Sequence, residues 1–299
     1  LLAAIVGPAD DQAKALARKL TTDLKLSNEN PLFDALADAT TGAATALPSS
    51  SSTNYLARGT GNWYVRGAWT SETSWSVFQC TRHLVDDHQY ANAGNWVLTR
   101  GGDDLVVDPS PYGSLSTLTG NAPAVDSASV PSGYSPSQGY WGQTTALVWA
   151  RQTGSGVAAG RCDYADQFQR TDGASDVSHA LRDFVMIPQG GGAAVVLIDR
   201  VVTGAAERAL HLRVRTPASL ASTPDGAAGK LGGSSLAIRK VWSSSGTPDV
   251  RVMPHASECP SSSHTCDVSK LAEGSEYRVD VAGPSAFAIH VINALAGAA

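Results

Sequence analysis

Short apolar runs separated by Gly-rich and Pro-rich turns occupy the chain from residue 54 onwards. Apolar and polar positions alternate in many of these runs, a pattern typical of β-strands with one buried face. Strands are predicted at 55–57, 62–66, 75–79, 95–99, 105–107, 145–150, 160–169, 178–187, 193–201, 209–215, 235–241, 249–253, 277–281 and 287–295. So many strands joined by Gly-rich turns predict a mainly β protein, built as a large antiparallel β-sandwich.

The first 50 residues show a different pattern. Apolar side chains recur near helical spacing at 10–26, and a second short helix is predicted at 31–39, with Pro31 in its first turn. Two short amphipathic helices cannot bury their apolar faces alone, so they must pack on another part of the protein. The sequence therefore predicts a helical segment at 1–50 and a β-sandwich domain at 51–299. We expect the chain to begin partway through a longer protein.

The composition of the chain bears on whether it binds nucleic acids or spans a membrane. The chain has 299 residues, of which 42% are hydrophobic and 16% are charged, with a formal net charge of -5. This charge gives no sign of the basic surface that binds nucleic acids. No apolar segment reaches the ~18 residues of a membrane-spanning helix, and the N-terminal LLAAIVG is too short for a signal peptide. We therefore expect neither a nucleic-acid partner nor a membrane span.

The four cysteines form two candidate pairs. Cys259 and Cys266 flank a six-residue polar loop, and this spacing predicts a local disulfide. Cys80 and Cys162 are either a second disulfide or two buried thiols that act as small hydrophobic residues. An even number of cysteines and a low charge favour an exported protein, either secreted or periplasmic.

Polar side chains that can transfer protons or bind sugars are concentrated at 86–113. His88, Tyr90 and Asn92 alternate there, so on an extended backbone they share one face. His88 is the first candidate for proton transfer, because an unperturbed imidazole titrates near neutral pH. Asp108 follows the strand predicted at 105–107. Titratable groups crowded beside buried strands indicate an active site, and the alternative is a set of polar residues that only completes the sandwich surface.

This block resembles the heparinase II/III-like family of polysaccharide lyases. The family pattern is a His-x-His-x-Asp run, then a strand, a Gly-rich turn and an apolar strand ending in Asp-Pro-Gly. The matching segments are HQYANAGNW at 88–96, RGG at 100–102 and LVVDP at 105–109. Further similar segments are YVRGAW at 64–69, GNAP at 120–123 and VVLIDR at 195–200. The likeness extends over residues 55–215 and is looser in the remainder.

The resemblance implies an α/α toroid followed by a multi-layered β-sandwich. Residues 1–50 would then be the end of the toroid, and an N-terminal helical domain would be absent from this chain. Tyr90 and Asn92 depart from the family pattern, which has His and Asp at these positions. In relatives with a structural zinc, the second His and the Asp matching Asp108 are ligands. Tyr90 removes a nitrogen ligand, so no metal or other cofactor is predicted, and Asp108 alone remains a candidate ligand.

The resemblance also implies cleavage of a uronate-containing glycan by β-elimination. This reaction needs a base for the proton next to the carboxylate, a group that neutralises the carboxylate, and an acid for the leaving oxygen. His88 and Tyr90 are predicted to transfer protons; alternatively, they are a surface His and a packing ring. Asp108 is predicted to support the site by orienting its neighbours. The candidates for substrate binding are Arg66, Trp69, His83, Gln89 and Asn92.

The function predicted from these residues is that of a lyase acting on an acidic polysaccharide. The first alternative is a non-catalytic carbohydrate-binding or structural β-sandwich module that has lost the lyase chemistry, as Tyr90 and Asn92 suggest. A further alternative is an unrelated hydrolase or surface-adhesion sandwich.

Overall fold

The computed structural model describes residues 53–81, 92–108, 117–129, 138–139, 145–170, 172–253 and 273–297. These residues belong to one unit of the chain, Thr53–Ala299. Several predictions fall outside the described residues and stay predictions: the helical segment at 1–50, His83, His88, Gln89, Tyr90 and the pair Cys259–Cys266. No helix in the described part is long and apolar enough to cross a membrane.

The first sheet is a five-stranded antiparallel meander in which neighbours in sequence are neighbours in space. Its strands are β1 (Asn54–Ala57), β2 (Asn62–Arg66), β3 (Ser74–Gln79), β4 (Trp96–Arg100) and β5 (Asp103–Val106). Burial alternates along β3, from fully buried Ser74 to half-buried Gln79. This alternation turns one face of β3 towards the core and leaves the other face half-buried.

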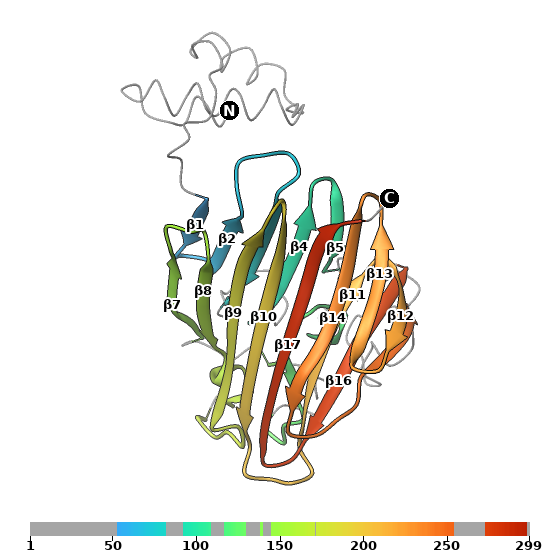
Figure 1. Cartoon of the computed structure of the whole chain (residues 1–299). Helices are drawn as coiled ribbons and strands as arrows, with labels where there is room; N and C mark the ends of the chain where they lie inside the picture. The colour runs from blue at the N-terminus through green and yellow to red at the C-terminus, as the bar shows by residue number, and fades with distance from the viewer. Residues whose placement is uncertain are drawn as a thin grey trace, which may run out of the picture. The chain divides into compact units, whose positions relative to one another are not determined.

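The second sheet has eight antiparallel strands in the order β12-β13-β14-β17-β10-β9-β8-β7. They are β7 (Ala146–Gln152), β8 (Ala158–Asp163), β9 (His179–Gln189), β10 (Gly192–Val202), β12 (Ser219–Thr223), β13 (Gly226–Leu231), β14 (Ser234–Ser243) and β17 (Ser285–Ala296). The long strands β9, β10, β17 and β14 stand at the front of Figure 1.

The third sheet has four antiparallel strands in the order β15-β16-β11-β6. They are β6 (Ala124–Val125), β11 (Ala209–Thr216), β15 (Asp249–Met253) and β16 (Gly274–Ala282). Two short 3-10 helices, η1 (Thr117–Thr119) and η2 (Ala165–Phe168), complete the described elements.

Aromatic side chains join the five-stranded and eight-stranded sheets. Phe184 of β9 stacks on Phe78 of β3 with ring centroids 5.0 Å apart, and its ring also meets Trp63 and Trp96 at 6.5 and 6.2 Å. All four rings are almost fully buried. Offset and edge-to-face pairs of this kind stabilise a core beyond the area they bury. The third sheet adds its apolar face to the same core, through Leu212, Val214, Tyr277 and Val279.

The mainly β, antiparallel sandwich predicted from alternation is confirmed, but the sequence did not reveal every strand. β12 and β13 are built from SLAST and GAAGKL, which are short of the β-branched and aromatic residues typical of strands. β13 is instead stabilised by its ladder with β14, which pairs six residues. The strand predicted at 160–169 ends at Asp163, where η2 follows.

Candidate functional site

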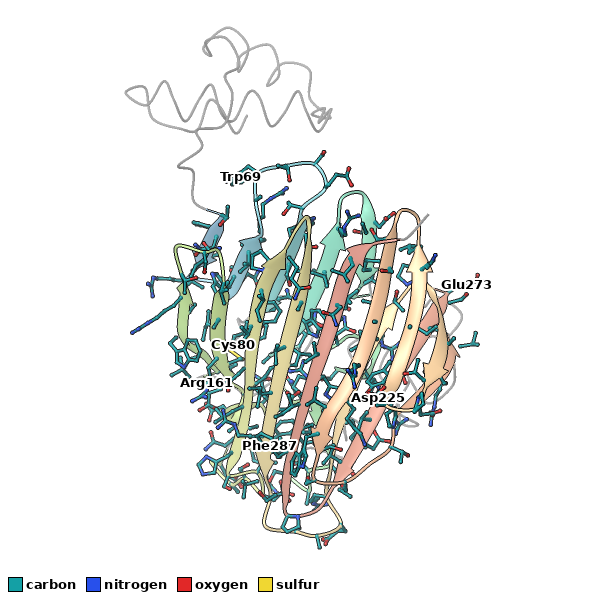
Figure 2. All side chains as sticks on the ribbon, viewed as in Figure 1. Trp69, Cys80, Arg161, Asp225, Glu273 and Phe287 are labelled. Atoms are coloured by element: carbon teal, nitrogen blue, oxygen red, sulfur yellow. A yellow bond between two sulfur atoms is a disulfide. The ribbon has the colours of Figure 1, made fainter. Side chains whose placement is uncertain are left out.

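The described candidate residues lie on or beside the five-stranded sheet. Arg66 ends β2, Trp69 follows in the loop before β3 (Figure 2), Asn92 precedes β4, and Asp108 follows β5. One face of β2 carries the side chains of Asn62, Tyr64 and Arg66. Asn62 is the residue of β2 that pairs with Gln79 of β3. Gln79 and Arg66 therefore share a face but lie four residues apart along the strand, roughly 13 Å at 3.3 Å per residue.

A cluster of side-chain amides, which we call the amide cluster, joins Gln79, Asn92, Asn95 and Asp108. The Asn95 amide nitrogen donates to Gln79 Oε1 and to Asp108 Oδ2, both over 2.7 Å. The Asn92 amide nitrogen also donates to Gln79 Oε1, over 3.4 Å. Asn95 is fully buried and Asn92 is 8% exposed. Buried polar groups with complete hydrogen bonds hold one conformation, so the cluster fixes the backbone at the start of β4.

The two flanks of the segment 82–91 are held together. The Thr81 hydroxyl donates to Asn92 Oδ1 over 2.9 Å, and the Gly94 backbone N–H donates to the Gln79 carbonyl over 2.7 Å. A disulfide joins Cys80 to Cys162 of β8, which confirms the second of the two cysteine pairs. Both flanks of the segment that carries His88 and Tyr90 therefore adjoin strands of the five-stranded sheet, and the Cys80 flank is also joined to the eight-stranded sheet.

Asn121, which lies in one of the similar segments, connects three parts of the fold. Its side-chain nitrogen donates to the carbonyls of Trp96 and Val107 over 3.0 and 2.7 Å. Its side-chain oxygen accepts from the Arg215 backbone N–H over 2.7 Å, and its own N–H donates to Asn95 Oδ1 over 2.9 Å. A fully buried amide with these partners supports the amide cluster.

Arg182 and Gln138 were not singled out from the sequence, yet both bind the backbone next to the cluster. Arg182 donates to the Gly94 and Asn121 carbonyls over 2.8 and 2.7 Å, and forms a buried pair with Asp199 through Nε over 2.7 Å. Gln138 forms hydrogen bonds with both backbone groups of Ala93 over 2.8 and 2.9 Å. A signal for the ion pair was present, because opposite charges occur within the apolar strands at 178–187 and 193–201.

Burial shifts the pKa values of two groups near Arg182, the carboxyl of Asp199 and the phenol of Tyr164. Burial raises the pKa of the Asp199 carboxyl, although the Arg182 guanidinium opposes this shift. Burial also raises the pKa of Tyr164 well above its usual value, and the negative charge of Asp199 adds to the shift. A buried phenol of this kind stays neutral at physiological pH. These shifts are those of a packed interior and do not by themselves indicate catalysis.

Arg66 and Trp69 form a cation–π pair at the other end of the same face. The Arg66 guanidinium carbon lies 5.0 Å from the ring centroid of Trp69, and Arg66 Nε donates to the Ala68 carbonyl over 3.3 Å. Burial lowers the pKa of Arg66, but a guanidinium stays charged at neutral pH. Tyr55 and Tyr64 form an exposed pair on neighbouring strands, with ring centroids 6.2 Å apart. Exposed aromatic rings beside a cation make this face a candidate sugar-binding surface.

The described donors do not fit a zinc ion. Asp108 is a hydrogen-bond acceptor for Asn95, and no group of three His, Cys, Asp or Glu side chains that could hold a metal occurs among the described residues. Tyr90 also replaces the nitrogen ligand that the resemblance implies at its position. No step of the chemistry below is therefore assigned to a metal.

No protein-family model matches the sequence, and no curated protein matches it. Solved structures, in contrast, share its fold. A crystal structure of heparinase III has a TM-score of 0.61 at 13% identity, covering 87% of this chain and 39% of that chain. The heparan sulfate lyase HepC from Pedobacter heparinus has a TM-score of 0.59 at 11% identity, covering 94% and 42%. A heparinase III BT4657 gene product has a TM-score of 0.61 at 12% identity, covering 96% and 42%.

This chain spans about two fifths of the length of those proteins. Identities this low establish the fold and leave activity open. The β-sandwich implied by the sequence resemblance is thereby confirmed, since the chain shares the fold of heparinase III and heparan sulfate lyase structures. The toroid end at 1–50 stays a prediction.

Proposed function

We propose that this chain is part of a polysaccharide lyase that cleaves a uronate-containing glycan by β-elimination. The observation that carries the proposal is the shared fold with heparinase III and heparan sulfate lyase structures. The segment that carries the predicted titratable residues also lies in the sequence between Thr81 and Asn92, which are joined by a hydrogen bond.

His88 and Tyr90 are proposed to transfer the protons. One of them takes the proton from the carbon next to the carboxylate, and the other donates a proton to the leaving glycosidic oxygen. The residue that is deprotonated in the substrate complex acts as the base, and the other residue acts as the acid. The hydrogen bond between Thr81 and Asn92 supports this role, because it restricts the end-to-end distance of the segment that carries both residues.

Arg66 is proposed to hold an acidic group of the substrate, and Trp69 to stack on a sugar ring. Trp69 is 37% exposed, and the neighbouring Tyr64 and Tyr55 are 40% and 66% exposed. These rings follow one face of β1 and β2, so an extended glycan lying on this face would meet several of them. A guanidinium suits a carboxylate because its N–H groups form a rigid fork. Gln89, His83 and Asn92 remain proposed substrate contacts.

The proposal is tested by the ultraviolet absorbance of the double bond that β-elimination creates. The protein in its full natural length is incubated with alginate and with heparin-type and chondroitin-type glycans from acid to alkaline pH. His88→Ala should lower the rate on the order of 10²- to 10⁴-fold, the usual contribution of a general acid or base. His179→Ala is the matched control, because His179 is exposed at the start of β9. If no unsaturated product forms with any uronate glycan, the proposal is wrong.

A non-catalytic glycan-binding module is the second candidate. It is favoured by Tyr90 and Asn92, which replace the His and Asp of the family pattern, and by the exposed rings of Tyr55 and Tyr64. This candidate predicts retention on a uronate-glycan affinity column without cleavage, and no change in retention for His88→Ala. New reducing ends without unsaturation would instead favour a hydrolase.

The proposed compartment is secreted or periplasmic. The disulfide between Cys80 and Cys162 supports this location, because disulfides persist in oxidising compartments. An acidic polysaccharide outside the cell is the substrate class that such a location makes accessible.

A further inference from the structure

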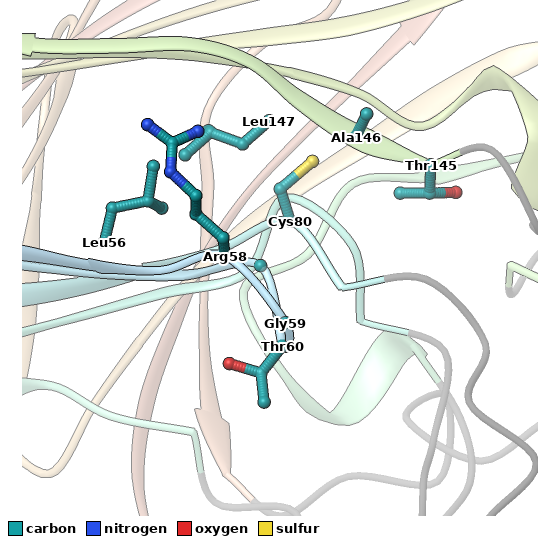
Figure 3. Close-up of a pocket in the computed structure, with 9 residues that line it drawn as sticks. Leu56, Arg58, Gly59, Thr60, Cys80, Thr145, Ala146 and Leu147 are labelled. Atoms are coloured by element: carbon teal, nitrogen blue, oxygen red, sulfur yellow. The ribbon is translucent and has the colours of Figure 1, made fainter.

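A pocket of about 240 Å³ lies where the turn between β1 and β2 meets the end of β3 and the start of β7. Figure 3 shows its lining, and the residues are Leu56, Arg58, Gly59, Thr60, Gly61, Cys80, Thr145, Ala146 and Leu147. Pockets for drug-sized ligands measure roughly 300–1,000 Å³. This pocket therefore has room for one sugar unit or one small anion.

The pocket walls are held by covalent and backbone contacts. Cys80 is joined to Cys162 of β8, and Cys162 pairs with Leu147 of β7, so the disulfide fixes one wall to the opposite one. The Cys80 N–H donates to the Gly61 carbonyl over 2.9 Å. Gly61 has φ +73, and a side chain there would collide with the Cys80 carbonyl oxygen. The sequence at this turn thus keeps the pocket floor in one geometry.

Arg58 supplies a positive charge that is not balanced within the described part of the chain. No ion pair or hydrogen bond links its guanidinium to another described residue, and Figure 3 shows its head beside Leu56 and Leu147. A guanidinium is weakly hydrated and can lie against apolar side chains while its N–H groups stay free to donate. The Thr145 hydroxyl of the lining accepts from Gln167 Nε2 over 2.7 Å and keeps its own hydrogen to donate, whereas the Thr60 hydroxyl donates to the Ala57 carbonyl over 3.4 Å.

We propose that this pocket binds the carboxylate or sulfate of one sugar unit of an acidic polysaccharide, with Arg58 as its main ligand. The inference rests on the proposed function and adds a subsite to it. Cys80 of the lining directly precedes Thr81, whose hydroxyl holds Asn92. The pocket therefore adjoins the fixed flank of the proposed catalytic segment. A sugar held here would be anchored by its charge while the neighbouring unit reacts.

The test measures binding by isothermal titration calorimetry with a uronate oligosaccharide, a sulfated oligosaccharide and a neutral oligosaccharide of equal length. Arg58→Ala should weaken binding of the charged probes on the order of tenfold or more, because a charge-assisted hydrogen bond is lost. Arg58→Lys should bind with intermediate affinity, since it keeps the charge without the fork. The two charged probes decide whether a carboxylate or a sulfate is the group recognised.

Arg151→Ala is the matched control, because Arg151 is an exposed arginine of β7 that does not line the pocket. It should bind the charged probes within about twofold of the unchanged chain, and neither variant should change the thermal unfolding midpoint. Equal losses in Arg58→Ala and Arg151→Ala would reduce the effect to overall charge and overturn the inference. Equal affinity for charged and neutral probes, or no binding of any probe, would also overturn it.

Binding and cleavage are measured separately, so the two proposals fail in different ways. If unsaturated product forms but Arg58→Ala binds as tightly as the unchanged chain, the subsite is wrong and the lyase proposal stands. If binding depends on Arg58 but no unsaturated product forms, the subsite belongs to a non-catalytic module and the lyase proposal fails.

Discussion

Asn95 donates a hydrogen bond from its side-chain amide to the Asp108 carboxylate over 2.7 Å, which joins the start of β4 to the residue pair that follows β5. The Asn95 side chain has two further hydrogen bonds in the same place. It donates to Gln79 and accepts from the Asn121 backbone N–H. Because Asn95 is fully buried, water cannot replace these partners. The orienting role proposed for Asp108 rests on this contact.

Asp108→Ala should lower the free energy of unfolding by about 1–3 kcal/mol, because it leaves a buried amide hydrogen of Asn95 without its acceptor. Urea denaturation measures the change, with an unchanged dependence on urea concentration. Glu207→Ala removes an exposed carboxylate and serves as the control. A loss in Asp108→Ala no larger than in Glu207→Ala would show that the amide cluster does not depend on Asp108.

The disulfide between Cys80 and Cys162 closes a loop with a sequence separation of 82 residues. In the chain-entropy model, a loop of this length stabilises the folded state by roughly 4–5 kcal/mol. The double variant Cys80→Ala, Cys162→Ala should therefore unfold at a much lower urea concentration than the oxidised chain. The measurement is urea denaturation with and without a reductant.

The same double variant tests the predicted pair Cys259–Cys266. If that disulfide forms, the double variant should still lose some stability on reduction, but less than the unchanged chain, because the loop it closes is short. A double variant as stable as the oxidised chain would contradict the stabilising role of the Cys80–Cys162 bond.

The sandwich was predictable because its strands bury one face in a repeating way. In β3, the large residues Trp75, Val77 and Phe78 predict a strand, but the sequence does not show which face is buried: Ser74, Ser76 and Phe78 are buried, whereas Trp75 and Val77 are half-buried. β12 and β13 were not predictable, since their small residues have no strong preference for a strand. β13 depends on its pairing with β14, and β12 depends on its pairing with β13. Local pattern therefore identifies strands with large apolar residues, including the edge strands β1, β7 and β15, and misses strands that are built from small residues.

The candidate site was predictable only in part. Asn92 and Asp108 could be found because they lie in one short segment with a recognisable spacing. The contacts of Arg182 with Gly94 and of Gln138 with Ala93 could not, because they join residues 88 and 45 positions apart. Contacts over such distances follow from how the sheets stack. The Arg58 pocket has the same origin, since it exists only where β1 and β7 meet.

Arg182 and Asp199 form an ion pair that is almost completely buried, with side chains 1% and 0% exposed. Arg182→Met should lower the free energy of unfolding by roughly 3–5 kcal/mol, because it leaves the Asp199 charge buried and unpaired. Adding Asp199→Leu to it should restore part of this loss, since no charge then remains in the core. The two unfolding free energies are compared by urea denaturation.

Comparing the single and the double variant separates the effect of the unpaired Asp199 charge from the effect of the other lost contacts of Arg182. Arg182 also donates to the Gly94 and Asn121 carbonyls, which the double variant does not repair. A double variant that is as unstable as Arg182→Met would assign the loss to these carbonyl contacts and not to the buried carboxylate. As a control, Arg170→Met breaks an exposed pair with Asp172 and should change stability by less than about 1 kcal/mol.

His211 of β11 lies between two carboxylates, with Nδ1 2.8 Å from Asp280 and Nε2 3.1 Å from Asp126. Burial by itself lowers the pKa of His211, but the hydrogen bonds with Asp126 and Asp280 outweigh burial, so the pKa is raised. The same contacts lower the pKa of both carboxyls against the effect of burial. Three cations face this group: Arg213 opposes the rise in the pKa of His211, Arg208 helps to lower the pKa of Asp126, and Arg278 forms an ion pair with Asp280.

The stability contributed by His211 depends on pH in a definite direction. Its pKa is higher in the folded state than the ordinary value of 6.5, so the contribution is complete below pH 6.5 and is lost as pH rises through the folded-state pKa. The carboxyls of Asp126 and Asp280 act in the opposite direction. Their pKa values lie below 3.8, and their contribution is lost only as pH falls below that value.

The urea midpoint of the unchanged chain should therefore fall over the pH range above 6.5, and His211→Gln should remove most of this fall. The range begins at pH 6.5 because burial lowers the pKa of His290 to about 3, and that residue destabilises the fold only below pH 6.5, where the unfolded chain becomes protonated. His179→Gln, which changes an exposed imidazole, should keep the full decline. If His211→Gln declines as steeply as His179→Gln, the stabilising charge lies elsewhere and His211 is not protonated between its two carboxylates.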